Sequence, residues 1–250
     1  MSTRLLLVVT LLLLLGLALS LLANRLLLQR SRAYERLYNQ TRLDPLGLDE
    51  FPAGETTTSE RPHILLYGDS RARQWPAPPI NQGQVVNRGI DGHTSRQALL
   101  RFPIHAAPLQ PDILVLQVGV NDVMGLALFS DQRDQIIGQT QDNIAQIVAN
   151  TRALGGRVIL TTIFAPGREP AIAHPWQANP AGTLSALAEI NTFLASLAAN
   201  DVLLLDAARL LADEQGYTKA AYLQDTWHLN PAGYALLNDE LGQLLATWEP

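Results

Sequence analysis

The chain has 250 residues, a formal net charge of −5 at pH 7 and no cysteine. The length is sufficient for one α/β catalytic domain with appendages, and the negative charge excludes the basic footprint that binding to nucleic acid requires. The lack of cysteine excludes disulfides, thiolate metal sites and a cysteine nucleophile.

The N-terminal sequence predicts a transmembrane anchor over residues 1–24. From Leu5 to Ala23 it carries no charge, and its polar residues are Thr10 and Ser20. This run approaches the roughly 20 apolar residues that cross a bilayer. A cleaved signal peptide is the alternative, but the run is longer than the usual apolar core of such peptides, and a small-x-small site is present only weakly at 18–20. A buried helix of a soluble domain fits poorly, because the run has no polar face.

Residues 25–62 are predicted to form a juxtamembrane helix and a linker. Leucines and arginines at helical spacing extend to Tyr38, which favours a helix in the membrane interface or a solvated stalk. Residues 44–62 then have the Pro, Gly, Thr and Ser content of a linker. A folded domain is therefore expected from residue 63 to residue 250.

Short apolar runs alternate with longer segments of helical spacing throughout this domain. The runs are continuously apolar, which is typical of parallel strands buried on both faces. The predicted strands are 63–68, 84–87, 112–119, 157–164 and 201–207, and the predicted helices are 94–102, 131–154, 183–199 and 231–248. The alternation predicts a doubly wound α/β sandwich around a five-stranded parallel sheet.

Polar or small residues follow three consecutive predicted strands. Ser70 follows the first strand in Gly-Asp-Ser, Gly89 follows the second, and Asn121 follows the third in Gly-Val-Asn-Asp. Asp225 and His228 stand three residues apart, just before the last predicted helix. Ligands bind outside the carboxyl ends of the strands in such sheets, so we expect these residues to converge at that edge.

This set of residues contains the parts of a serine hydrolase site. A serine hydroxyl needs a base that takes its proton, the base needs a partner that orients it, and the oxyanion needs preorganised donors. Ser70 is the candidate nucleophile, His228 the base and Asp225 its partner. The backbone N–H groups of Ser70 and Gly89 and the amide of Asn121 are candidates for the oxyanion hole. Each motif alone is also explained by a turn or a helix cap, but their order together favours catalysis.

The four segments resemble the sequence blocks of the SGNH, or GDSL-type, esterase family, which is named for serine, glycine, asparagine and histidine. These fall here on Ser70, Gly89, Asn121 and His228, the family's acid falls on Asp225, and the resemblance covers residues 63–248. It implies a flavodoxin-like three-layer α/β/α sandwich and hydrolysis of esters or thioesters without metal or cofactor. No spacing typical of a zinc site and no Gly-rich phosphate loop argues otherwise.

Several further residues are candidate substrate contacts. Arg71 replaces the aliphatic residue that the family has after Gly-Asp-Ser, and a guanidinium at position 71 or 73 suits a carboxylate or phosphate on the substrate; local packing on a surface helix is the alternative. His93 is expected at the pocket mouth or in a solvated loop. The long connection 164–182 is expected to roof the site, with Trp176 and Arg168 in contact with substrate, or to be a surface excursion.

The favoured function is a serine-dependent hydrolase of an O-acyl ester in a small molecule, a carbohydrate or a lipid. An O-acetyl group of a surface polysaccharide is preferred to a lysophospholipid, because no lid-like apolar helix interrupts the domain. An O-acyltransferase would use the same triad, and a non-catalytic envelope-binding module would keep the fold without the chemistry.

The orientation of the anchor has conflicting signals. Arg4 precedes the apolar run, whereas Arg25, Arg30, Arg32 and Arg36 follow it, so the positive-inside rule taken literally places the domain in the cytoplasm. An enzyme of envelope esters needs access from outside, and these arginines fit an interfacial helix. We therefore expect a single-pass membrane protein with an extracytoplasmic catalytic domain.

Overall fold

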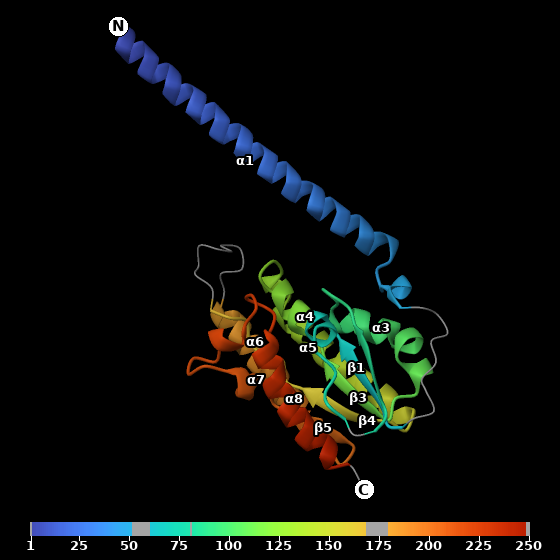
Figure 1. The fold of residues 1–250 in the computed structure, drawn as a ribbon. Helices are drawn as coiled ribbons and strands as arrows, with labels where there is room; N and C mark the ends of the chain where they lie inside the picture. The colour runs from blue at the N-terminus through green and yellow to red at the C-terminus, as the bar shows by residue number, and fades with distance from the viewer. Residues whose placement is uncertain (1, 52–60, 81, 169–179, 249–250) are drawn as a thin grey trace. The chain divides into compact units, whose positions relative to one another are not determined.

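A computed structural model describes residues 2–51, 61–80, 82–168 and 180–248, in two compact units, 1–45 and 46–250. The first unit is one helix, α1 (Thr3–Leu43), which begins after Ser2 and has no buried residue (Figure 1). The helix is long and apolar enough to cross a membrane, and a signal sequence has the same features. It continues without a break past residue 24, where the sequence placed the end of the anchor.

The second unit is built on a five-stranded parallel sheet, which confirms the predicted architecture. Its strands are β1 (His63–Gly68), β2 (Gln84–Gly89), β3 (Ile113–Gln117), β4 (Arg157–Thr161) and β5 (Val202–Leu205). The spatial order is β2-β1-β3-β4-β5, with every neighbouring pair parallel. This is the flavodoxin-like order, in which the direction of winding reverses between β1 and β3. The β3 and β4 strands are shorter than predicted, because the apolar residues that follow them are buried outside the sheet.

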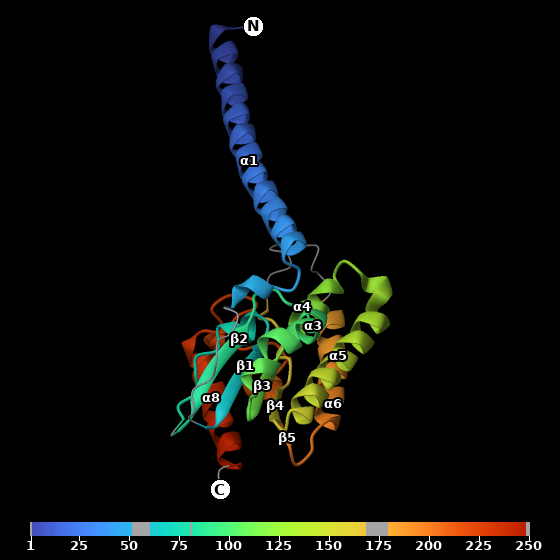
Figure 2. The same cartoon turned by 90° about the vertical axis from the view of Figure 1, so that its right-hand side faces the viewer.

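Helices cover both faces of the sheet and make it a three-layer sandwich (Figure 2). One face carries α3 (Ser95–His105), α5 (Arg133–Ala153) and α6 (Pro180–Ser196), and the other carries α7 (Ala207–Leu211) and α8 (Pro231–Ala246). Successive residues of β1 point to opposite faces, so Leu65 packs under α3 and α5 while Leu66 packs under α8.

Shorter helical elements complete the unit. Two of them, α2 (Ser70–Arg73) and α4 (Val120–Gly125), begin at the carboxyl ends of β1 and β3. The single-turn helices are η1 (Leu48–Glu50), η2 (Ala107–Leu109), η3 (Ser130–Gln132) and η5 (Ala220–Tyr222). The elements that follow β1 and β3 thus place residues 70 and 121 on either side of the point where the winding reverses.

Residues 46–51 pack on the folded unit, although their sequence was assigned to the linker. Glu50 forms an ion pair with Arg73, and the Phe51 ring meets the His105 ring edge-on at a centroid distance of 5.2 Å. The guanidinium of Arg88 lies 4.5 Å from the centre of the same Phe51 ring. The composition of this segment predicts a linker because its turn residues are common in linkers. The segment packs on the domain because its aromatic residue, Phe51, contacts His105 and Arg88.

Candidate active site

The nucleophile candidate lies in a sharp turn between β1 and α2. Asp69 caps α2 by accepting the N–H of Arg71 at 2.9 Å, and Ser70 is the first residue of the helix. Its N–H therefore lies outside the intrahelical hydrogen bonds. Gly68 has φ of 147°, and a Cβ at this position would lie 1.8 Å from the carbonyl oxygen of Gln117. Glycine is required here because the turn passes directly against β3.

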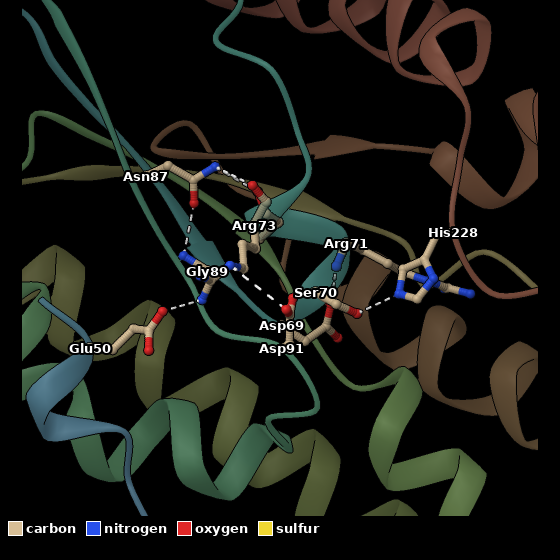
Figure 3. Close-up of polar contacts among 10 residues, drawn as sticks. Glu50, Asp69, Ser70, Arg71, Arg73, Asn87, Gly89, Asp91 and His228 are labelled. Carbon is tan, nitrogen blue, oxygen red and sulfur yellow. Dashed lines mark hydrogen bonds and ion pairs between the residues drawn. The ribbon is translucent and has the colours of Figure 1, made fainter. Parts of the chain in front are cut away.

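His228 and Asp225 meet Ser70 across 158 residues of chain. The Nε2 atom of His228 lies 3.0 Å from Oγ of Ser70, and Figure 3 shows the ring facing the serine. On the other side of the ring, Nδ1 lies 2.9 Å and 3.0 Å from the two carboxylate oxygens of Asp225. The structure thus brings the three predicted residues into one hydrogen-bonded series.

A closed loop presents the Asp225–His228 pair. Gln224 N–H donates to the carbonyl of His228 at 2.9 Å, and Asn230 N–H donates to the carbonyl of Tyr222 at 2.9 Å. The side chain of Asn230 also caps α8 by accepting the N–H of Gly233 at 3.0 Å. The Asn-Pro sequence that opens α8 therefore fixes the base of the loop, and the acid and the imidazole lie at its tip.

Two aspartates near Ser70 have opposite pKa shifts. Partial burial works to raise the pKa of Asp225, but hydrogen bonds from His228 and from the N–H groups of Trp227 and His228 outweigh it and hold that pKa below its ordinary value. Complete burial raises the pKa of Asp69 to about 6, against the opposing effect of Arg71. Asp225 is therefore the carboxylate that stays ionised beside the imidazole.

The side chain of Asn121 is held in place by a hydrogen bond to the turn after β2. It lies in the first turn of α4, and its Nδ2 donates to the carbonyl of His93 at 2.9 Å. A primary amide has two N–H donors, so a second one remains for another acceptor. The neighbouring Asp122 accepts the backbone N–H of Ser95 at 2.8 Å and its hydroxyl at 2.6 Å, which ties α4 to the start of α3.

Gly89 does not fit the predicted role of oxyanion donor. Its N–H already donates to Oδ1 of Asn87 at 2.8 Å. A Cβ on Gly89 would lie 2.1 Å from the backbone nitrogen of Arg73. The glycine is needed because α2 packs directly on β2, a requirement that the sequence motif does not distinguish from a catalytic one.

Gly92, three residues later, is a candidate donor that the sequence analysis did not single out. It has φ of 73° in a turn closed by a hydrogen bond of 3.3 Å from His93 N–H to the carbonyl of Ile90. The turn is hydrogen-bonded to the ends of both β1 and α4. The N–H of Ile90 donates to the carbonyl of Gly68, and the carbonyl of His93 accepts from the side chain of Asn121. Within the part of the chain that the structure describes, the N–H of Gly92 has no hydrogen-bond acceptor. The repeated glycine in Gly-Ile-Asp-Gly was the available signal.

The candidate substrate contacts have other roles or lie outside the described residues. Arg71 is only 1% exposed and donates to two backbone carbonyls of distant segments, so neither the predicted substrate contact nor local packing on a surface helix describes its place. The His93 ring is buried, and its carbonyl is the group that contacts Asn121. Arg168 donates to Gln215 at 3.0 Å. Trp176 lies outside the described residues.

Comparison with known proteins identifies the family. The model of the GDSL-like lipase/acylhydrolase family matches residues 51–236. Thioesterase 1/protease 1/lysophospholipase L1 of Escherichia coli is 33% identical over 115 residues, which are 41% of this chain and 51% of that protein. Esterase TesA of Pseudomonas aeruginosa is 36% identical over 83 residues, 33% of this chain and 37% of that protein.

These curated relatives are matched over about half of their length or less. A GDSL-like lipase from Bacteroides thetaiotaomicron has the same fold, with a TM-score of 0.56 at 22% identity, over 74% of this chain and 88% of that one. Because the family model covers most of the chain and its fold is the one observed, the chain belongs to the GDSL-like lipase/acylhydrolase family.

Proposed function

We propose that the chain is a serine-dependent acyl-ester hydrolase with Ser70 as nucleophile, His228 as general base and Asp225 as the group that orients His228. The observation that carries the proposal is the 3.0 Å contact between His228 Nε2 and Ser70 Oγ, together with the carboxylate on the other ring nitrogen. This arrangement lets the imidazole accept the serine proton while the carboxylate stabilises the resulting imidazolium.

The reaction proceeds in two halves. Oγ of Ser70 attacks the acyl carbonyl carbon as its proton passes to Nε2 of His228, and a tetrahedral oxyanion forms. The C–O bond to the alcohol breaks, and the alcohol leaves with the proton from His228. Water then attacks the acyl-enzyme, again with His228 as base. Collapse of the second oxyanion releases the carboxylic acid and returns the proton to Ser70.

Three N–H donors stabilise the oxyanion in this proposal. They are the backbone N–H of Ser70, the second amide N–H of Asn121, and the backbone N–H of Gly92 in place of Gly89. The support for Gly92 is that its N–H has no acceptor among the described residues and that its turn is hydrogen-bonded to both Gly68 and Asn121. Donors held in advance stabilise developing charge without reorganisation during the reaction.

The substrate is proposed to be an O-acyl ester of a carbohydrate or a lysophospholipid. The names of the curated relatives, which include thioesterase, lysophospholipase and esterase, support acyl groups on oxygen or sulfur. A comparison of p-nitrophenyl acetate, p-nitrophenyl palmitate, acetylated xylan and lysophosphatidylcholine separates the two classes. Turnover confined to the acetyl substrates favours the carbohydrate ester, and turnover of the long-chain substrates favours the lipid.

The test of the catalytic proposal is Ser70→Ala in the full chain purified in detergent. We expect kcat on p-nitrophenyl acetate to fall by about 10³-fold or more, because the residual catalysis of such sites comes from binding and the oxyanion hole alone. Labelling by a fluorophosphonate should be lost as well. Ser196→Ala, an exposed serine on α6, is the matched control. A Ser70→Ala protein that retains full activity contradicts the proposal.

Two alternatives share the site. An O-acyltransferase would pass the acyl group from Ser70 to a carbohydrate hydroxyl, so acetyl transfer to added oligosaccharides, exceeding the release of acetate, would favour it. A non-catalytic envelope-binding module would bind glycans but would neither turn over esters nor react with the fluorophosphonate.

We also propose that α1 anchors the chain, with residues 25–45 as its juxtamembrane part and the catalytic domain on the extracytoplasmic side. The length and apolar character of α1 support the anchor. Reporter fusions at the C-terminus test the topology: alkaline phosphatase activity without fluorescence of a cytoplasmic reporter is the expected result, and the reverse pattern places the domain inside.

A further inference from the structure

Arg71, next to the candidate nucleophile, is a buried cation that binds backbone from two distant segments. Its Nε donates to the carbonyl of Trp227 at 3.1 Å, and its Nη1 donates to the carbonyl of Phe164 at 2.6 Å. The guanidinium also lies 3.6 Å from the centre of the Phe164 ring. A buried charge is stabilised by hydrogen bonds of this kind, and losing them would leave it uncompensated. The two bonds therefore hold the Arg71 side chain in one position.

The carbonyl that Arg71 binds belongs to the residue immediately before His228. Figure 3 shows the Arg71 side chain extending from α2 towards His228. The second segment is linked to the same loop, since Gly167 N–H donates to the carbonyl of Thr226 at 2.7 Å. Arg71 therefore connects the nucleophile turn to the loop that carries the base, both directly and through the segment after β4.

The backbone of Arg71 is fixed as well. Its N–H donates to Asp69 at 2.9 Å, and its carbonyl accepts the hydroxyl of Tyr234 on α8 at 3.0 Å. Burial lowers the pKa of Arg71 to about 10, and Asp69 opposes this shift, so the guanidinium stays protonated at neutral pH. A fixed cation with planar donors can hold a peptide carbonyl in a way that an aliphatic side chain cannot.

The loop itself has mainly local hydrogen bonds around its tip. Asp225 accepts the N–H groups of Trp227 and His228, which shapes the tip but does not attach it to α2. Half of the Asp225 side chain is exposed, so packing restrains it weakly. Trp227 and Leu229, on either side of His228, pack on the core of the domain, and the hydrogen bond from Arg71 to Trp227 ties this part of the loop directly to α2.

We propose that Arg71 is a positioning residue that holds the His228 loop at hydrogen-bonding distance from Ser70. This inference rests on the proposed function. Arg71 does not touch the substrate; it acts on the chemical step through Trp227 and His228. A mutation far from the reacting bond that displaces a reacting group by about 1 Å can lower the rate about 100-fold.

The experiment compares Arg71→Leu, Arg71→Lys and Arg71→Ala in the full chain in detergent. For Arg71→Leu we expect kcat on p-nitrophenyl acetate to fall about 100-fold while KM changes by less than about twofold, because positioning affects the transition state more than binding. Arg71→Lys should fall in between, since an ammonium cannot donate to both carbonyls in the same plane. Ethylguanidinium at non-denaturing concentrations should restore activity to Arg71→Ala and not to Ser70→Ala.

Controls separate positioning from general stability. Arg152→Leu, which removes an exposed arginine paired with Asp201, should leave kcat unchanged. Thermal unfolding and circular dichroism of each variant establish the folded fraction, and kcat is calculated per folded molecule. If Arg71→Leu does not fold, the inference is tested by the kcat of Arg71→Lys and by the rescue of Arg71→Ala with ethylguanidinium.

Several results overturn the inference. Wild-type kcat in Arg71→Leu, a loss seen mainly as a rise in KM, a loss that matches the unfolded fraction, or failure of ethylguanidinium to restore a folded Arg71→Ala would each do so. These outcomes leave the proposed function intact as long as Ser70→Ala is inactive. An active Ser70→Ala would instead remove the proposed function, and this inference with it.

Discussion

The two sides of Ser70 are built differently. On the base side, Asp225 and His228 lie in a loop, with side chains that are 51% and 24% exposed, and local hydrogen bonds shape that loop. On the oxyanion side, Asn121 is backed by buried polar groups, in which Asp122 binds Ser95 and Asn143 donates to the Ser95 hydroxyl at 3.0 Å. The base side thus exposes its functional side chains although Trp227 and Leu229 beside them pack into the core, whereas the oxyanion side is supported by buried polar groups.

This difference suits the chemistry proposed for each side. The base must exchange protons with the alcohol and with water, so it benefits from access to solvent. The oxyanion donors must not reorganise during the reaction, so they benefit from rigid support. We therefore expect changes on the base side to act through protonation and tautomer, and changes on the oxyanion side to act through loss of a fixed donor.

The largest effect in this comparison is expected for Asp225→Asn. The amide can present an N–H to Nδ1 of His228 and favour the tautomer that cannot accept the Ser70 proton, so kcat should fall by about 10³-fold with the fold unchanged. Steady-state kinetics on p-nitrophenyl acetate measure the loss, and Asp239→Asn, an exposed aspartate on α8, is the control. A loss below tenfold would show that the carboxylate is not needed to orient the imidazole.

A smaller effect is expected for Asn121→Ala on the oxyanion side. Loss of one preorganised donor should lower kcat by about 10²-fold and leave KM within a few-fold, because the donor acts on the transition state. Asn150→Ala at the far end of α5 is the matched control, since Asn150 contacts Gln146 on the same helix. An unchanged kcat would mean that Asn121 only supports the turn at His93 through its hydrogen bond.

A further prediction concerns stability, not activity, and contrasts the two aspartates. The folded chain holds the proton of Asp69 more tightly than the unfolded chain does, because burial raises the pKa from 3.8 to about 6. The free energy of unfolding should therefore fall as pH rises from about 4 to about 6, by about 3 kcal/mol for this group. Asp225 has a lowered pKa, so its contribution is present above its ordinary pKa and is lost as the pH falls below that value.

Asp69→Asn isolates the first of these contributions. The amide keeps an oxygen that can accept the N–H of Arg71, so the cap survives while the titration is removed. Chemical denaturation of the full chain in detergent, measured between pH 4 and pH 7, should show a flatter dependence on pH in the variant. Identical slopes for the variant and the original chain would contradict the raised pKa.

Much of the fold and of the base side was predictable from local signals. The continuous apolar runs mark buried parallel strands, and their alternation with helices predicts the sandwich. Ser70, Asn121 and the Asp225–His228 pair follow strands or precede the last helix, so the topology itself brings them to one edge. These signals are readable because strand burial, helix starts and turns leave marks over a few neighbouring residues.

Tertiary structure alone decided which of two glycines has an available N–H and where the Arg71 side chain points. Gly89 and Gly92 look equivalent in the sequence Gly-Ile-Asp-Gly. In the structure the N–H of Gly89 donates to Asn87, and its Cα packs directly against α2. Arg71 sits on a short helix at the strand end, yet it turns inwards to a carbonyl 156 residues away. Such choices depend on which distant backbone groups need a hydrogen-bond partner after packing, and the local sequence carries no record of that need.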